Sequence, residues 1–485
     1  MMLTNITVTA MHLLTRAIQV TSSLLLLIAA PTAIRAAGIT LTSTDRNLGI
    51  QIQDALPGDR GTRLLYRTSP DEAQAHVRDR CTANFYLLDL QPGLPAASPQ
   101  LLAENFCGYG LMSGTLLANG DVLIIAGDQV ESWRPGSGKV NAWKFSDVGS
   151  LSGIWKEINA GAAALDVSRN GNIVMARDLP RQRNDTAMPS AVVIGLSVDG
   201  ARQWQFELQA PGVLLGVSNI WATGDDGALL HATARPMSEP HLPDTQAPPG
   251  ATITHQDRLY RISATGELSA AIVIASATMP DFTNPVPLPD VTRDPSGFQA
   301  ALERQQTLSN LEAVDQIAAH PHSDGRTDVL IRRGSNAESR KGSTFYRIGR
   351  DGKVAMEISL EKAITGEGLR TWTDFSADDN QVVLYGAVGT RQNRLPQGFL
   401  SRIVLANGQV VTHLAPLDEL GLEAAKGAAD EQVQFLEHHP AQQPVLLTRL
   451  GERPLMISLI RRSRRAAIQI DEGTDQLAVF TEARN

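Results

Sequence analysis

The sequence is short of charge, and of positive charge in particular. Charged residues make up 19% of its 485 residues, and 43 Lys and Arg against 51 Asp and Glu leave a formal net charge of −8. A general nucleic-acid-binding surface must be basic enough to displace counterions from phosphates. The charge balance therefore excludes general nucleic-acid binding and restricts any anion site to a local cluster.

Recognised catalytic and cofactor motifs are also missing. The sequence contains neither a phosphate-binding loop nor a dinucleotide-binding fingerprint. Ser113 in GLMSG lacks the strand-to-helix context of a nucleophile elbow, and His320 and His322 with Asp324 lack a further ligand at a recognised metal-binding interval. We therefore expect no cofactor and no metal, and the sequence names no catalytic residue.

An apolar run near the N-terminus has the features of a secretory signal. Arg16 supplies positive charge, Leu24–Ala30 are apolar, and small residues follow at Ala33–Ala37. Polar residues interrupt the stretch before Leu24, so it is too short to cross ~30 Å of hydrocarbon. We predict that residues 1–37 are a cleaved signal peptide, that no transmembrane span remains, and that the protein is exported, either periplasmic or secreted.

The two cysteines, Cys81 and Cys107, both follow this segment. An exported compartment permits their oxidation, and a disulfide that closes the interval between them would contribute ~3 kcal/mol by the loop-entropy estimate. We predict a Cys81–Cys107 disulfide, and the alternative is two buried thiols. Neither cysteine lies at the signal exit, which argues against a lipid-modified N-terminus.

Glycine and proline are plentiful, with 40 and 26 copies. This composition favours many turns and short strands over long helices. Short β-rich runs are broken by Gly, Asn or Asp, as in LLANGDVLII at Leu116–Ile125 and FYRIGRDGKVAMEI at Phe345–Ile358. Such runs predict consecutive β-hairpins.

The turns recur in pairs with nearly constant spacing. The pairs are Gly61 with Gly93, Gly120 with Gly149, Gly171 with Gly200, Gly227 with Gly266, Gly325 with Gly352, and Asn380 with Gly408. Two hairpins per unit of roughly 50 to 56 residues form a four-stranded blade, which must stack on copies of itself.

The repeat therefore predicts an all-β fold, a β-propeller of about seven four-stranded blades, in a single domain over residues 38–485. The alternatives are six or eight blades, or a tandem of β-sandwiches. Ring closure needs a strand from each end of the chain, and Ile39–Ser43 and Gln476–Thr481 are available for it.

Two segments resemble repeats of the β-propeller superfamily. GTLLANGDVLIIAG at Gly114–Gly127 resembles a kelch-type strand pair, and LSVDGARQWQFEL at Leu196–Leu208 resembles the turn-and-tryptophan end of a quinoprotein-like repeat. The resemblance implies the propeller fold over residues 47–472. It implies no specific family, no cofactor and no catalytic residue.

The connections between the paired turns should lie together on one face and carry long loops. An insertion at residues 279–308 should contain a helix at Phe298–Gln306, with Asp294 or Ser296 as N-cap, over the channel mouth. Guanidinium groups bind carboxylate or sulfate with two hydrogen bonds. Candidate ligand-binding residues in these loops are Arg181, Arg183, Arg332, Arg333, Arg340, Arg391 and Arg394. Solvated loop charge is the alternative explanation.

The leading hypothesis is an exported binding or interaction module. Its loop face would meet an extracytoplasmic ligand, such as an anionic glycan, or a protein partner. The alternative is an extracytoplasmic hydrolase or lyase, with acid and base groups that converge at the channel mouth from different blades. Carboxylates or histidines within hydrogen-bond reach of one another in the channel would favour the enzyme.

Overall fold

The computed structural model describes a chain that is almost entirely β-strand. The described residues are 41–42, 48–58, 61–70, 83–91, 98–106, 112–148, 163–179, 191–210, 213–236, 252–280, 290–310, 314–333, 343–360, 369–389, 397–405, 409–414, 431–435, 446–450, 453–464 and 473–481. Within them, the only helical elements are α3 (Pro295–Asn310) and the short 3-10 turn η2 (Phe145–Asp147).

Six sheets have four antiparallel strands each, hydrogen-bonded in chain order. Blade 1 consists of β2 (Leu48–Gly58), β3 (Gly61–Pro70), β4 (Ala83–Leu90) and β5 (Gln100–Phe106); blade 2 of β6 (Met112–Leu116), β7 (Val122–Ala126), β8 (Gln129–Arg134) and β9 (Gly138–Lys144); blade 3 of β10 (Ala163–Val167), β11 (Ile173–Asp178), β12 (Ala191–Leu196) and β13 (Arg202–Leu208); blade 4 of β14 (Val213–Ala222), β15 (Ala228–Pro236), β16 (Thr252–Ile262) and β17 (Ile272–Pro280); blade 5 of β18 (Val314–Pro321), β19 (Thr327–Arg333), β20 (Ser343–Ile348) and β21 (Val354–Ser359); and blade 6 of β22 (Leu369–Ala377), β23 (Gln381–Gly389), β24 (Gln397–Val404) and β25 (Gln409–Leu414).

A further sheet, the closing sheet, joins the two ends of the chain. It contains β26 (Glu431–Phe435), β27 (Leu446–Leu450), β28 (Arg453–Arg464), β29 (Gly473–Thr481) and β1 (Leu41–Thr42). Leu41 pairs with Leu477 and Thr42 with Gln476, so the predicted closure by the terminal strands is confirmed. The closing sheet departs from the four-stranded order, because β28 pairs with both β26 and β27 on one side.

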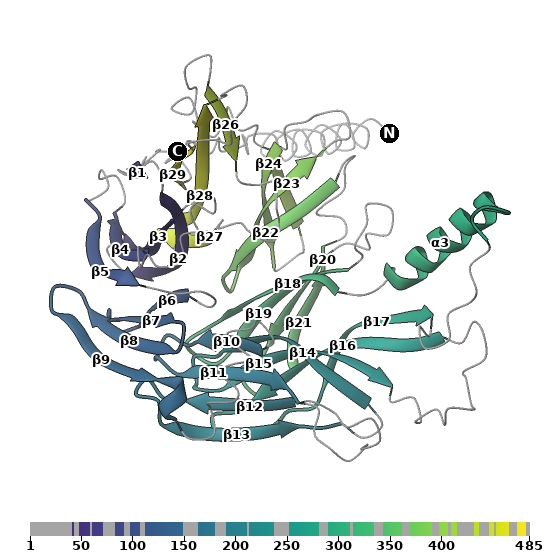
Figure 1. Ribbon diagram of the computed structural model, residues 1–485, viewed down its shortest axis with the longest axis horizontal. Coiled ribbons are helices and arrows are strands. Elements are labelled where there is room, and N and C mark those ends of the chain that lie inside the picture. Colours follow the sequence, from purple (N-terminus) through teal and green to yellow (C-terminus); the bar gives the residue numbers. More distant parts are fainter. Residues whose placement is uncertain are drawn as a thin grey trace, which may run out of the picture.

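The blades follow one another around a common centre (Figure 1). First strands of neighbouring blades contact each other in four pairs: β2 with β6, β10 with β14, β14 with β18, and β18 with β22. The closing sheet contacts blade 6 through β27 and blade 1 through β2. The predicted all-β propeller is confirmed, with the six four-stranded blades of the six-blade alternative and the closing sheet between blade 6 and blade 1. The alternative of facing sandwich layers is wrong.

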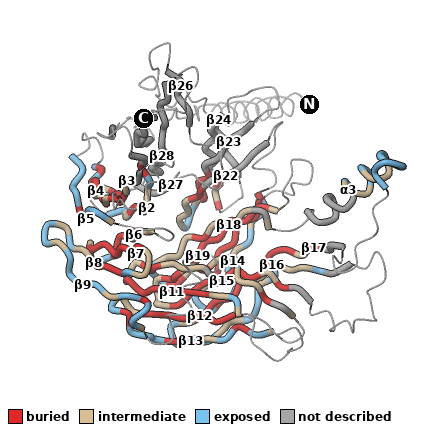
Figure 2. Tube along the Cα trace, viewed as in Figure 1, coloured by how far each residue is buried: buried red, intermediate tan, exposed pale blue. Residues whose placement is uncertain are grey.

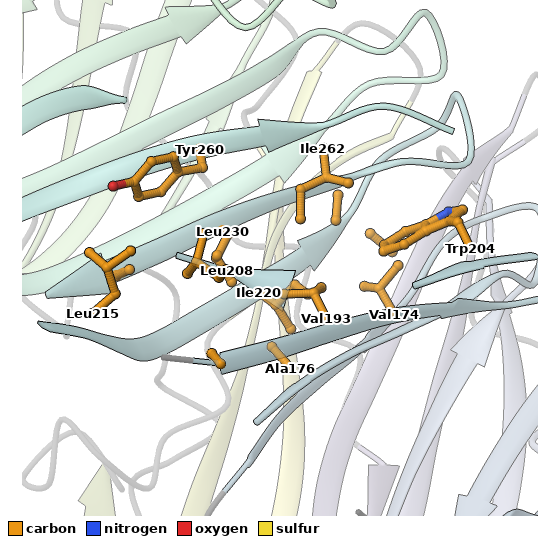
Figure 3. Packing of buried hydrophobic residues seen from close by; sticks show 14 of the residues in the cluster. Val174, Ala176, Val193, Trp204, Leu208, Leu215, Ile220, Leu230, Tyr260 and Ile262 are labelled. Carbon is orange, nitrogen blue, oxygen red and sulfur yellow. The ribbon is translucent and has the colours of Figure 1, made fainter. Parts of the chain in front are cut away.

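The core lies between blades. All five residues of β7 are buried, whereas most of the outer strand β9 is exposed, and Figure 2 shows this change from buried to exposed between the second and outer strands of the lower blades. Between blades 3 and 4, Val193, Leu230, Ile262 and Trp204 pack in one cluster (Figure 3). Burial of such apolar side chains stabilises the fold by roughly 1.5–3 kcal/mol each.

Trp204, the tryptophan of the turn-and-tryptophan segment, connects blade 3 to blade 4. Its indole Nε1 donates to the carbonyl oxygen of Asp226 in blade 4, 3.4 Å away. Gly195 lies beneath the ring, where an added Cβ would stand 2.3 Å from a ring carbon. Trp143 of blade 2 likewise donates to Val198 of blade 3 over 2.9 Å. The outer strand of one blade is thus fastened to a turn of the next.

The first turns of blades 2 to 5 have the expected backbone, whereas Asn380 in the first turn of blade 6 does not have a positive φ. Gly120, Gly171 and Gly325 have φ of 86°, 88° and 86°, and Asp226 takes the same place in blade 4 with φ of 66°. These turns define the short-turn face. The pairing of Gly120 with Gly149 is wrong, because β7 and β8 are joined by a tight connection, and the second hairpin therefore turns earlier, at residues 135–137.

The predicted helix of the insertion is present as α3. Asp294 Oδ1 accepts the backbone N–H of Gly297 over 2.9 Å, which makes Asp294 its N-cap. The expectation that this helix covers the channel mouth is wrong, because α3 contacts β17, the outer strand of blade 4, and projects from the rim (Figure 1). In the described part of the chain, no helix has the length and apolar character needed to cross a membrane.

Candidate functional site

A cavity of about 450 Å³, the central cavity, lies at the short-turn end of the first strands. Strands β2, β6, β10, β14 and β18 and the turns that follow them form its wall, so five blades contribute to it. Its chemically active side chains include Asp54, Asp166, Arg169, Trp221 and His320. The volume falls in the range of small-molecule sites.

Four lining residues occupy the same place in successive blades. Thr115, Asp166, Trp221 and His320 each stand five residues before the residue with positive φ in the first turn of their blade. The repeat thus places one side chain per blade at the cavity wall. The hairpin depends on the turn residue. The position five residues earlier can therefore hold a polar, charged or aromatic side chain.

Arg169 and Asp54 form an ion pair that spans three blades. Arg169, in the first turn of blade 3, contacts both carboxylate oxygens of Asp54 in blade 1, with Nη2 2.8 Å from Oδ1. Arg169 also donates to the carbonyl oxygen of Leu116 in blade 2 over 2.8 Å, and Asp54 accepts the Leu116 N–H over 2.8 Å. The positive charge of Arg169 is therefore neutralised within the protein.

Asp166 reaches from blade 3 to blade 4. Its Oδ2 accepts the backbone N–H of Ala222 over 2.7 Å. Burial raises the pKa of Asp166 from 3.8 to about 6, against the opposing effect of the N–H groups of Ala222 and Val167. Its carboxylate therefore titrates close to neutral pH.

His320 of blade 5 pairs with Asp374 of blade 6. Its Nε2 lies 3.1 Å from Asp374 Oδ1, and its ring meets the ring of Phe375 edge-on with centroids 4.5 Å apart. Burial lowers the pKa of His320, but the charge and hydrogen bond of Asp374 outweigh burial, and the pKa is raised from 6.5. The pair therefore favours the imidazolium form.

His322 is held by a different carboxylate. Its Nε2 lies 2.8 Å from Oδ2 of the buried Asp328, which also accepts two hydrogen bonds from Arg347 over 2.7 and 3.0 Å. Burial raises the pKa of Asp328, but His322 and Arg347 outweigh it, and the pKa is lowered. Asp324 in turn pairs with Arg326.

The sequence set of His320, His322 and Asp324 thus divides among three separate partners. Among the described residues, no three His, Cys, Asp or Glu side chains gather where they could hold a metal ion.

Two of the predicted ligand-binding arginines lie in a strand. Arg332 and Arg333 belong to β19, and Arg332 is 8% exposed. Arg333 donates to the carbonyl oxygen of Ile274 in blade 4 over 2.7 and 3.1 Å, and to the Tyr346 hydroxyl over 3.0 Å. The guanidinium of Arg333 therefore joins two blades instead of standing on a loop.

The other sequence-predicted features lie outside the described residues. These are Arg181, Arg183, Arg340, Arg391, Arg394, Cys81, Cys107 and residues 1–37. Their roles stay predictions.

Sequence reasoning missed Asp54, Asp166, Arg169, Trp221 and Asp374. A usable signal exists for some of them, since an alignment of the repeats on the first-turn residue places Asp166, Trp221 and His320 in one column. In this column Asp166 interrupts the otherwise apolar sequence of β10. The column therefore marks the positions that face the centre of the ring.

No protein-family model matches the chain, and no curated protein matches it. Similar solved structures include the polysaccharide lyase Uly1, with 9% identity over 94% of this chain and 91% of that chain and a TM-score of 0.36. The phage phi92 endosialidase is similar with 9% identity over 93% of this chain and 70% of that chain and a TM-score of 0.38. A protein of unknown function from Bacteroides caccae is 10% identical over 70% of this chain and 92% of that chain, with a TM-score of 0.30. These similarities assign neither a family nor an activity, and the chain is described as a β-propeller.

Proposed function

We propose that the protein is an exported binding module that holds a sugar unit, uncharged or cationic, in its central cavity. The observation that carries this proposal is the charge of the cavity wall. Arg169 is matched by Asp54 and His320 by Asp374, while Asp166 keeps a carboxylate that titrates at about 6. The wall therefore disfavours an anionic ligand.

The other lining groups suit a sugar. Gln53, Ser168 and Asn170 line the cavity with amide and hydroxyl groups. Each already makes a hydrogen bond within the protein, to Gly114, Asn172 and Gly224 respectively. Their remaining donor and acceptor positions suit hydrogen bonds to hydroxyls. Trp221 supplies aromatic surface, and its half-buried ring packs against the core between blades 4 and 5. Aromatic surface beside polar groups matches a ring with one apolar face and a hydroxylated rim.

The anionic-glycan hypothesis requires the loop arginines instead of the cavity. Arg333 forms hydrogen bonds between two blades. Two other candidate arginines, Arg391 and Arg394, lie outside the described residues. The two hypotheses therefore predict different ligands and different sensitive residues, which makes them separable by one binding experiment.

The experiment uses residues 38–485 on a glycan microarray with neutral, amino-sugar and acidic oligosaccharides. We expect retention of neutral or amino-sugar ligands, and at least a tenfold loss in affinity for Asp166→Ala and Trp221→Ala. Asp351→Asn, an exposed carboxylate in the second turn of blade 5, is the matched control. Binding of acidic glycans alone, with loss on Arg391→Glu and Arg394→Glu, would overturn the cavity proposal in favour of the loop face.

Export is part of the proposal and rests on residues 1–37. Expression of the full chain in a bacterial host, followed by fractionation and intact-mass measurement, tests it. We expect the extracytoplasmic form to begin near Ala37. A full-length chain confined to the cytoplasm would refute export without affecting the binding proposal.

An extracytoplasmic hydrolase or lyase is the second candidate function. It is favoured by the His320–Asp374 pair, which lies within hydrogen-bond reach at the cavity that also contains Asp166. Incubation of any bound oligosaccharide and assay of new chain ends tests this function. Cleavage that is lost in His320→Gln supports an enzyme, and an intact ligand rejects it.

A further inference from the structure

We propose that the central cavity contains a subsite for a primary ammonium group, formed by the carboxylate of Asp166 and the aromatic surface of Trp221. The inference deepens the proposed function, because it selects amino sugars among the ligands that the cavity accepts. It also predicts that a simple amine competes for the same place.

The first argument is the contrast between two carboxylates in similar positions. Asp54 and Asp166 each accept a backbone N–H from the first strand of the next blade, from Leu116 and Ala222 respectively. Asp54 is neutralised by Arg169. Among the described residues, no arginine, lysine or histidine forms an ion pair with Asp166. The ion pairs of the cavity thus leave one carboxylate without a matching cation.

The second argument is that Trp221 lines the same cavity from the neighbouring blade. The hydrogen bond from Ala222 to Asp166 fixes the carboxylate next to the residue that follows Trp221 in β14. Both side chains line the cavity, from the same position of neighbouring blades. A cation near an indole ring gains about 0.5–2 kcal/mol from the ring quadrupole, in addition to its attraction to the carboxylate.

The third argument is that the subsite is already formed without a ligand. Trp221 is held against the cluster of Leu229, Leu259 and Ala319 between blades 4 and 5. Asp166 is held by the backbone of blade 4. A fixed carboxylate and a fixed ring cost little conformational entropy when an ammonium group binds.

The protonation of Asp166 supports the same assignment. Its carboxylate is charged above a pKa of about 6, and Asp54 and Arg169 are the charged groups that act on it. His320, at the same cavity, is more positive at low pH because its pKa is raised. Ammonium binding should therefore strengthen as the pH rises through about 6, since Asp166 gains its charge there, and strengthen again at higher pH, above the ordinary value of 6.5, where His320 loses its own charge.

The test compares three tetrasaccharides that have the same linkage and differ only in the substituent on C2 of each sugar ring. They are cellotetraose, the glucosamine tetramer and the N-acetylglucosamine tetramer, measured by calorimetry on residues 38–485 at pH 7 and pH 5. We expect the glucosamine tetramer to bind at least tenfold more tightly than the other two at pH 7. At pH 5 this preference should fall severalfold.

Two variants separate charge from shape. Asp166→Asn keeps the acceptor for Ala222 and should abolish the amine preference, so that the glucosamine tetramer binds no more tightly than cellotetraose. Trp221→Leu should weaken all three ligands. Equal affinities for the three tetramers in the wild-type protein would overturn the ammonium subsite and leave sugar binding standing. Absence of binding by every tetramer would instead overturn the proposed function.

Cadaverine, a diamine without a sugar ring, distinguishes the source of the ammonium group. Cadaverine binding that depends on Asp166, without binding of any tetramer, would keep the subsite and reject the sugar. An amine preference that survives Asp166→Asn would reject the subsite itself.

Discussion

Arg169 crosses blade 2 to pair with Asp54 of blade 1, and it contacts both oxygens of that carboxylate. On its way it donates to the carbonyl oxygen of Leu116. One side chain thus connects three blades at the short-turn end of the ring, where the central cavity lies. This contact supports the cavity wall, and it engages the one arginine among the described residues that line the cavity.

Replacement of this arginine should destabilise the protein. Arg169→Met leaves a mostly buried Asp54 without its cation, at a cost of about 1–3 kcal/mol. Chemical denaturation of the variant measures the loss. The double variant Asp54→Asn with Arg169→Met should recover part of it, because the unpaired charge is gone. A double variant that is less stable by the sum of both single effects would mean that the two residues act independently.

The pKa of His320 should depend on Asp374. The neighbouring carboxylate favours the imidazolium, so Asp374→Asn should move the titration of His320 to lower pH. The shift is measured by NMR of the imidazole C–H signals across a pH series. Asp324→Asn is the control, because that carboxylate pairs with Arg326. An unchanged titration midpoint in Asp374→Asn would show that another group sets the pKa.

Asp166 should make the protein less stable as the pH rises. Its pKa is 3.8 as the ordinary value and about 6 in the folded chain, so the folded state binds more protons between these values. Stability from this group is thus greatest below pH 4 and falls as the pH passes through about 6. Asp166→Asn should therefore be more stable than the wild type at pH 7.5, by up to about 3 kcal/mol, and equal to it at pH 3.5.

Denaturation midpoints at the two pH values measure this difference. Asp199→Asn is a useful comparison, because the Ser197 hydroxyl lowers the pKa of that exposed carboxyl, and its effect should have the opposite sign. A stabilisation by Asp166→Asn that is the same at both pH values would contradict the charge explanation.

The predicted disulfide can be tested from the pairing of β4 and β5. Ala83 pairs with Phe106 across this hairpin; Cys107 directly follows Phe106 in the sequence, and Cys81 precedes Ala83 by two residues. We expect the exported protein to be two mass units lighter before reduction. Cys81→Ser should cost about 3 kcal/mol by the loop-entropy estimate. Two thiols that react with iodoacetamide in the native protein would mean that the bond is absent.

The fold was predictable because the hairpin turns report it directly. Glycine in blades 2, 3 and 5, and Asp226 in blade 4, set the first turns at fixed places. The intervals between the turns gave the blades without any knowledge of contacts between blades. The closing sheet was harder to predict, since β28 pairs with two strands on one side, an arrangement that the other described sheets do not have. In blade 2 the second turn was predicted at Gly149 and lies at residues 135–137, because the hairpins of this blade are shorter than those of the average unit.

The site was not predictable in the same way. Asp54 and Arg169 are separated by more than a hundred residues and meet only because the ring brings blade 1 near blade 3. The arginines of the long loops attracted attention because charge in a loop is easy to see in a sequence. A single Asp or Trp inside a β-strand is not conspicuous until the blades are aligned by their turns.

The pairing of Leu41 with Leu477 has a consequence for biosynthesis. Strand β1 has to wait for β29, more than four hundred residues later in the chain, before the two can pair. The ring therefore stays open until β29 has been synthesised, and the pairing of β1 with β29 is the step that closes it.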